Sequence, residues 1–181
     1  MAIVTLADAK KQVNVDDDDT SNDVELLGFI DAATAAVEEQ LGTVVEPRTC
    51  VDELDFRRPT RSFLLQAVPV ISLTSMTSLD GSRSWDLSPA AAHVEKASGR
   101  VTLIGATVSG TAILIYEAGL TVIGANIRLA AKIIIQHLWE TQRGTMGVQL
   151  GGDDEGYVPG RGFAIPRRAI ELLGNQLPGV A

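Results

Sequence analysis

Cysteine, histidine and aromatic residues are all scarce in this chain of 181 residues. Cys50 is the only cysteine, so no disulfide can form within the chain, which is typical of proteins from reducing compartments. His93 and His137 are the only histidines, and with one thiol they cannot complete a zinc site unless carboxylates contribute. Aromatic residues make up 4%, so we expect an aliphatic core, in which Cys50 is a packed thiol rather than a reactive one.

Long uninterrupted hydrophobic runs are also missing. The opening segment MAIVTLADAKK contains no apolar stretch of the kind found in secretory signals, so we expect no such signal. The most apolar stretch, residues 127–139, is interrupted by Arg128, Lys132 and Gln136. A membrane-spanning helix needs about 20 predominantly apolar residues. The sequence therefore predicts a protein that does not span a membrane and has no membrane partner.

A basic patch is not visible in the sequence, although charged residues are common. The net charge is −8 and is unevenly distributed: residues 1–60 hold 14 acids and 5 bases, whereas residues 61–181 hold 9 acids and 10 bases. A protein that grips nucleic acid normally carries lysine and arginine clustered on one face. An acidic face would instead let DNA pass without adhering.

Motifs for catalysis and cofactor binding are missing as well. There is no G-x-S-x-G nucleophile elbow, and GGDDEGYVPGRG, residues 151–162, fits neither the Walker A nor the dinucleotide-binding pattern. Acidic residues at the centre of that stretch would repel phosphate. The segment HLWE, residues 137–140, lacks the second histidine that a metalloprotease helix needs. We therefore expect no enzyme activity, no cofactor and no bound metal.

Asp16–Asp19, a run of four aspartates, is the segment most similar to a metal site. An EF-hand calcium loop can be aligned with residues 14–25, but Asp19 then occupies the position where a sharp turn requires glycine. A simpler interpretation is a solvated loop that begins a helix, with Asn22 as the cap and Glu25 completing a capping box. We favour the loop, and keep a calcium-dependent module and a charged contact with a partner as alternatives.

The periodicity of apolar residues predicts four helices. They cover about residues 5–14, 22–41, 125–143 and 165–173. Thr5 is placed to cap the first helix, and Gly42 to end the second. The third helix is apolar over most of its circumference and carries its polar residues on a single strip. We therefore expect it to be central to a core or to form an interface.

The region between the second and third helices has the pattern of short β-strands. The predicted strands cover residues 50–56, 62–66, 70–81, 100–105 and 110–119. Asp80–Gly81 is a strong turn signal, and Trp85 lies on its returning side. The last two strands flank a short turn, so we expect them to pair antiparallel. The predicted fold class is α+β, mainly helical with about four helices and a small antiparallel β insertion at residues 50–118.

The C-terminal part of the chain is rich in glycine, with seven glycines in residues 144–162. A loop of that length in a compact domain normally has a function. We divide the chain into a core domain, residues 1–143, and a glycine-rich arm with a short helix, residues 144–181. The arm and helix would reach a partner protein. The residues predicted to contact that partner are Arg161, Ile165, Arg167, Arg168 and Leu172.

Several short motifs occur in an order that is more informative than any one of them. They are Asp16–Asp19, Ala32–Ala33, Val37–Glu39, Pro69–Ser75, Asp80–Gly81, Tyr116–Gly119 and His137–Glu140. Their order and spacing over residues 3–143 resemble the head–tail connector proteins of long-tailed bacteriophages, also called adaptor or head-completion proteins. The chain departs from that pattern at Leu120, where the family often has an aromatic residue, and in the absence of a proline opening the next helix.

The resemblance implies a structural virion protein of the neck, made in the host bacterial cytoplasm. About twelve copies would form a ring beneath the portal protein. The ring would extend the DNA channel without sequence-specific DNA binding, and would offer a platform to a stopper or tail-completion protein. Two alternatives stay open: a small DNA-binding or regulatory protein, and a different neck or tail-completion protein.

Overall fold

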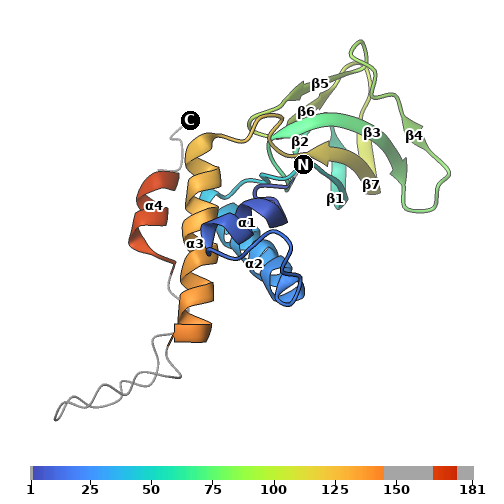
Figure 1. The fold of residues 1–181 in the computed structure, drawn as a ribbon. Coiled ribbons are helices and arrows are strands. Elements are labelled where there is room, and N and C mark those ends of the chain that lie inside the picture. Colours follow the sequence, from blue (N-terminus) through green and yellow to red (C-terminus); the bar gives the residue numbers. More distant parts are fainter. Residues whose placement is uncertain (1, 145–164, 175–181) are drawn as a thin grey trace, which may run out of the picture. The chain divides into compact units, whose positions relative to one another are not determined.

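The computed structural model describes residues 2–144 and 165–174, which form two compact units (Figure 1). The β unit is residues 43–122, and the helical unit combines residues 2–42 with the described residues from 123 onward. The β unit is thus inserted between two helices of the helical unit. The predicted boundary between a core and an arm at residue 143 stays a prediction, because the glycine-rich stretch lies outside the described residues.

The helical unit contains four helices within the described residues, as predicted. They are α1 (Leu6–Gln12), α2 (Asp23–Leu41), α3 (Ala125–Gly144) and α4 (Arg167–Leu173). α3 contacts each of the other three (Figure 1). Its buried side chains are those of Ile127, Ala130, Ala131, Ile134, Ile135 and Leu138. Of the two roles expected for this apolar helix, a central place in a core and an interface, the first is confirmed.

The polar strip of α3 packs against α1 instead of facing only solvent. Lys132 Nζ donates to Asp8 Oδ1 at 3.2 Å, and Gln12 Nε2 donates to Gln136 Oε1 at 2.7 Å. The hydrogen bond from Lys132, helped by one from Thr5, lowers the pKa of the Asp8 carboxyl below its ordinary value. These pairs join segments 124 residues apart in the sequence, so the polar strip helps to position α1.

The two predicted helix caps have different outcomes. Thr5 has an extended backbone (φ −80°, ψ 158°), and its Oγ1 accepts from the Asp8 backbone N–H at 3.2 Å, as predicted. Asn22 does precede α2, but its φ of −116° and ψ of 7° lie outside the extended region that a capping side chain needs. Its side chain makes no cap hydrogen bond, and Nδ2 donates to Ser21 Oγ at 2.9 Å. The predicted capping role of the Asn22 side chain is therefore wrong.

The β unit contains two antiparallel sheets. The first has the strand order β1-β7-β3-β4, built from β1 (Arg48–Thr60), β7 (Val108–Ala118), β3 (Val70–Ser78) and β4 (Ser84–Trp85). The second has the order β2-β6-β5, built from β2 (Ser62–Leu64), β6 (Arg100–Leu103) and β5 (Ala92–Glu95). The turn between β3 and β4 contains Asp80–Gly81, as predicted.

The expectation of a mainly helical chain with a small β insertion is wrong. The described residues form a β-rich α+β fold in which β1 has 13 residues, β7 has 11 and β3 has 9. The prediction also missed β5, whose segment AHVE combines residues of low and high β-propensity. Local propensity underestimates strands of this kind because burial and pairing with neighbours supply much of their stability.

The expected pairing of the last two predicted strands is also wrong. β6 pairs with β2 and β5, whereas β7 pairs with β1 and β3 in the other sheet. β7 buries every second side chain between Ala112 and Ala118. Its central place in the first sheet lets it bury these residues and use both of its backbone edges. Periodicity identified the strand correctly but carries no information about its partners.

Candidate assembly surfaces

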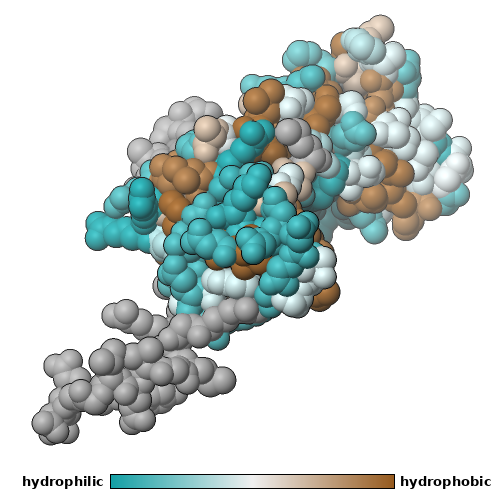
Figure 2. All heavy atoms as spheres, viewed as in Figure 1, coloured by the Kyte–Doolittle hydropathy of each residue, from teal (hydrophilic) through white to brown (hydrophobic). Residues whose placement is uncertain are grey.

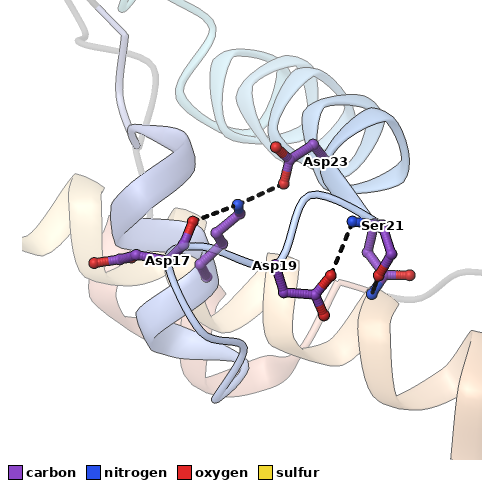
Figure 3. Close-up of polar contacts among 6 residues, drawn as sticks. Asp17, Asp19, Ser21 and Asp23 are labelled. Carbon is purple, nitrogen blue, oxygen red and sulfur yellow. Dashed lines mark hydrogen bonds and ion pairs between the residues drawn. The ribbon is translucent and has the colours of Figure 1, made fainter.

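The run of aspartates forms an exposed loop between α1 and α2, which one buried lysine holds in place (Figure 3). Lys10 is 3% exposed. Its Nζ donates to the backbone oxygen of Asp17 at 3.0 Å and lies 2.7 Å from Asp23 Oδ1 in an ion pair. The Asp19 carboxylate accepts from the Ser21 backbone N–H at 2.9 Å. These contacts agree with the favoured interpretation of a solvated loop that begins a helix, except that the Asn22 side chain does not cap that helix.

The charge balance around Lys10 explains why the loop has a defined shape. A buried ammonium is costly unless a carboxylate and hydrogen-bond acceptors surround it. Asp23, in the first turn of α2, supplies the carboxylate and also complements the positive end of the helix dipole. In the part of the chain that the structure describes, no three histidine, cysteine, aspartate or glutamate side chains gather closely enough to hold a metal ion.

A buried polar network joins the strands of the first sheet to the segment after β2. Asp52, 5% exposed on β1, accepts at Oδ2 from Tyr116 Oη (3.0 Å) and from the Gln66 backbone N–H (2.9 Å). Tyr116 Oη in turn accepts from the Ala67 backbone N–H at 2.9 Å. Burial, together with the neighbouring Asp52, raises the pKa of Tyr116 to about 12. The network satisfies its buried groups internally, which indicates a structural role.

The motif Tyr116–Gly119 has a structural explanation at its other end as well. Gly119 has a φ of +140°, and a Cβ at this position would lie 2.6 Å from Pro47 Cα. Its backbone N–H donates to the Pro69 carbonyl at 2.9 Å. Only glycine allows the chain to pass this close to another backbone segment. The motif therefore combines a buried hydrogen-bonding tyrosine with a close backbone contact, and both serve the fold.

A shallow hollow lies beside the turn between β3 and β4. Asp80 Oδ1 accepts from the hydroxyls of Ser78 (2.6 Å) and Ser82 (2.8 Å) and from the Ser82 backbone N–H (3.1 Å). These hydrogen bonds, first that from Ser78, lower the pKa of Asp80 to about 2. Arg83 also lines the hollow, but its side chain lies over the ring of Trp85 at 5.8 Å. The polar groups thus stabilise the turn itself.

Four of the five residues predicted to contact a partner can be placed, whereas Arg161 lies outside the described residues. Arg167 and Arg168 are exposed, and Ile165 and Leu172 are half-buried. Arg167 Nε lies 3.4 Å from Glu171 Oε1 on the same helix. The Leu172 carbonyl accepts from Asn126 Nδ2 at 3.1 Å. The four therefore lie on or beside α4, which buries Ala169 and Leu173, and their role in binding a partner stays a prediction.

Arginines gather around the turn between β1 and β2, a feature that the sequence analysis missed. Arg57, Arg58 and Arg61 are exposed, and none of them pairs with a carboxylate within the described residues. Arg100 on β6 joins them, because its Nε donates to Ser62 Oγ at 3.2 Å. We call these four residues the arginine tip. The sequence RRPTR was the available signal, but the contribution of Arg100 depends on strand pairing.

Large hydrophobic side chains also reach the surface of both units (Figure 2). In the helical unit, Val24 and Leu27 on α2 are 86% and 48% exposed. In the β unit, Val51, Leu64 and Ile104 are each more than half exposed. No helix among the described residues is long and apolar enough to cross a membrane. Single exposed aliphatic residues are ordinary on a protein surface, whereas contiguous apolar patches mark binding sites for other proteins.

Among the described residues, the buried charged side chains of Lys10 and Asp52 are held by an ion pair or by hydrogen bonds within the fold. Exposed charged and aliphatic side chains occur on both units. The chain belongs to the head completion protein family, whose model matches residues 2–175. The resemblance drawn from the order of the motifs is therefore confirmed.

Three solved structures show the same fold. A chain in the neck of an empty gene transfer agent (GTA) particle, computed with C6 symmetry, is 16% identical, with a TM-score of 0.65 over 95% of this chain and 88% of that chain. A chain in the virion of a native GTA particle is 16% identical, with a TM-score of 0.66 over 94% and 87%. A chain in the neck of a native GTA particle, computed with C12 symmetry, is 17% identical, with a TM-score of 0.62 over 93% and 86%. No curated protein matches this chain.

Proposed function

We propose that this protein is a structural component of the neck of a phage-like virion, where it forms a connector ring between head and tail. The observation that carries the proposal is the match of the head completion family over residues 2–175. Similarity of fold to chains from GTA necks and virions supports it. In this role the chain binds other proteins and performs no reaction.

The ring in this proposal has about twelve copies, seated beneath the portal protein around the DNA channel. One of the similar neck structures was computed with C12 symmetry and another with C6 symmetry. Both symmetries are compatible with a closed ring of that size. The ring carries the channel onward and offers its far face to a stopper or tail-completion protein.

The C-terminal part of the chain is the proposed link to a neighbouring ring. Arg167 and Arg168 are exposed on α4, and Ile165 and Leu172 are partly available beside them. Together with Arg161, they would form a small surface of cationic and aliphatic groups. Residues 1–143 would then build the ring, and residues 144–181 would reach the portal or the stopper.

The proposal is tested by mixing the purified chain with the portal protein of the same particle. Size-exclusion chromatography with light scattering measures the mass of the complex, and negative-stain electron microscopy shows its shape. We expect a ring of this chain stacked coaxially on the portal ring. Failure to associate with the portal under any salt condition would contradict the proposal. Salt-sensitive binding of duplex DNA in its place would favour the alternative of a small DNA-binding protein.

A further inference from the structure

The arginine tip is an unusual concentration of unpaired charge for an acidic protein. Residues 56–63, FRRPTRSF, contain three arginines and no acid. Leu103 N–H donates to the Arg61 carbonyl at 2.8 Å, and Ser62 Oγ lies 3.1 Å from Thr102 Oγ1. These contacts, with the hydrogen bond from Arg100 Nε to Ser62 Oγ, place Arg100 beside the turn. Arg57 and Arg58 precede the turn near the end of β1. The arginine tip is therefore a cationic stretch of the chain that is fixed to β6 at its turn.

Aliphatic side chains lie directly beside the arginine tip. Leu64 is 62% exposed and pairs with Arg100 in the β2–β6 ladder. Residues directly opposite each other in an antiparallel ladder point to the same face of the sheet. Ile104, 54% exposed, follows the end of β6. A cationic surface with exposed aliphatic neighbours matches the centre and rim of a protein–protein interface.

The helical unit carries a surface of the opposite charge. Residues 2–42 hold ten acids and two bases, which equals the entire net charge of the chain. Asp16–Asp19 are all exposed, in the loop that Lys10 anchors. Val24 and Leu27, one helical turn apart at the start of α2, are exposed close behind this loop in the sequence. This part of the chain also combines exposed charged and aliphatic side chains, but its charge is negative.

We infer that the arginine tip of one copy binds the aspartate loop, Asp16–Asp19, of the next copy in the ring. This inference rests on the proposed function. A closed ring of identical chains needs two different, mutually complementary surfaces on each chain, because its interfaces are heterologous. The tip and the loop belong to different units of the chain and have opposite charges. They are therefore suited to a head-to-tail contact that repeats around a ring.

A second copy of the chain fits the arginine tip better than nucleic acid does. Duplex DNA would meet a protein whose net charge is −8, and a few phosphate contacts give only weak, strongly salt-dependent binding. DNA offers no apolar partner of the kind that Leu64 and Ile104 would need. A neighbouring copy supplies both carboxylates and the aliphatic side chains of Val24 and Leu27.

Charge reversal at each surface tests the contact. The variants are Arg57→Glu/Arg58→Glu/Arg61→Glu and Asp16→Lys/Asp17→Lys/Asp18→Lys. The second leaves the anchor of the loop in place, because Lys10 binds the backbone oxygen of Asp17. A control with the same charge change as the first variant is Lys11→Glu/Lys96→Glu/Arg128→Glu, at exposed positions outside both surfaces. Circular dichroism checks that every variant folds.

Assembly is measured by analytical ultracentrifugation at low salt, with and without the portal protein. We expect wild type and the control to assemble, and each reversed variant alone to assemble at least about tenfold more weakly, because like charges then face each other. An equal mixture of the two reversed variants should regain assembly. In that mixture every contact again joins opposite charges, either the original pair or the swapped one.

The outcomes separate this inference from the proposed function. If both charge-reversed variants assemble as well as wild type, the inferred contact is wrong, but the proposed ring is not contradicted. Loss of assembly in both variants without recovery in the mixture would also overturn it. A wild-type chain that stays monomeric with and without the portal protein would overturn the ring as well. If the arginine variant assembles normally but loses salt-sensitive DNA binding, the arginine tip binds nucleic acid and the inferred contact is wrong.

Discussion

At the scale of single residues, the shape of the acidic loop depends on a lysine that the sequence pattern did not single out. Lys10 lies in a short helix next to Lys11, and the sequence alone does not show which of the two lysines is buried. In the structure Lys10 is buried and Lys11 is exposed. The difference arises because Asp23 and the Asp17 carbonyl are within reach of Lys10. An acid-rich loop thereby gains a fixed point at its base.

We predict that Asp23→Ala destabilises the helical unit by roughly 2–3 kcal/mol. The substitution leaves the buried Lys10 ammonium without its carboxylate, and breaking such a pair costs up to about 5 kcal/mol when both partners are fully buried. The expected value is lower because the Asp23 side chain is 24% exposed. Urea denaturation followed by circular dichroism measures the change. Asp17→Ala is the control, since it keeps the backbone oxygen; an equal loss in both variants would contradict the prediction.

The Tyr116 hydroxyl provides a second prediction at this scale, through its pH dependence. Its pKa is raised from 10.0 to about 12 in the folded protein. The folded state therefore holds the proton more tightly than the unfolded state does. This contribution to stability is complete below pH 10 and is lost as the pH rises from 10 to about 12.

Absorbance at 295 nm against pH measures this titration directly. The chain has two tyrosines, and we expect the one that ionises near pH 12 to disappear in Tyr116→Phe. The stability advantage of wild type over Tyr116→Phe should also shrink across the same pH range in urea denaturation. Ionisation of Tyr116 near pH 10 in the folded protein would contradict the prediction.

At the scale of elements, the chain leaves β7 in close contact with the segment that leads into β1. Gly119 follows β7 and passes close to Pro47. We predict that Gly119→Ala destabilises the protein by roughly 2–4 kcal/mol, because its Cβ would overlap another backbone segment at a φ that disfavours a side chain. Thermal unfolding followed by circular dichroism measures the effect.

Gly28→Ala is the matched control for this prediction. Gly28 is exposed in α2, and an added Cβ would meet no atom within 4 Å. We expect this change to stabilise the protein by about 0.5–1 kcal/mol, because alanine favours a helix interior over glycine. If the two glycine substitutions shifted stability in the same direction, the explanation of Gly119 by close contact would be wrong.

At the scale of the whole molecule, charge is separated along the chain. Residues 2–42 carry all of the net negative charge, while the arginine tip lies in the β unit. A separation of this kind favours attraction between different surfaces of identical chains. It also disfavours adhesion to DNA, as the proposed place of the ring around a DNA channel requires.

We predict no measurable binding of duplex DNA at about 150 mM salt and micromolar protein, because few cations face a large excess of acids. Fluorescence anisotropy of a labelled duplex measures binding, with a salt series as the control for weak electrostatic contacts. Submicromolar affinity at this salt concentration would contradict the prediction and would revive the DNA-binding alternative.

The sequence by itself determined the features that depend on neighbours along the chain. The four helices, the cap at Thr5 and the turn at Asp80–Gly81 follow from local spacing, backbone preference and short-range hydrogen bonds. The apolar circumference of α3 predicted either a central place in a core or an interface, and the first is observed. The family followed from the order of short motifs, several of which hold the fold together, as Tyr116 and Gly119 do.

Only the tertiary structure decided which distant segments meet. β6 and β7 each pair with a strand that is distant in the sequence, and Arg100 approaches Ser62 across such a pairing. Lys10 is buried although the sequence does not distinguish it from Lys11. Periodicity shows which face of an element is apolar, but it does not show which other apolar face packs against that face. The share of β-structure was underestimated for the same reason, since a strand gains stability from partners that a linear pattern does not contain.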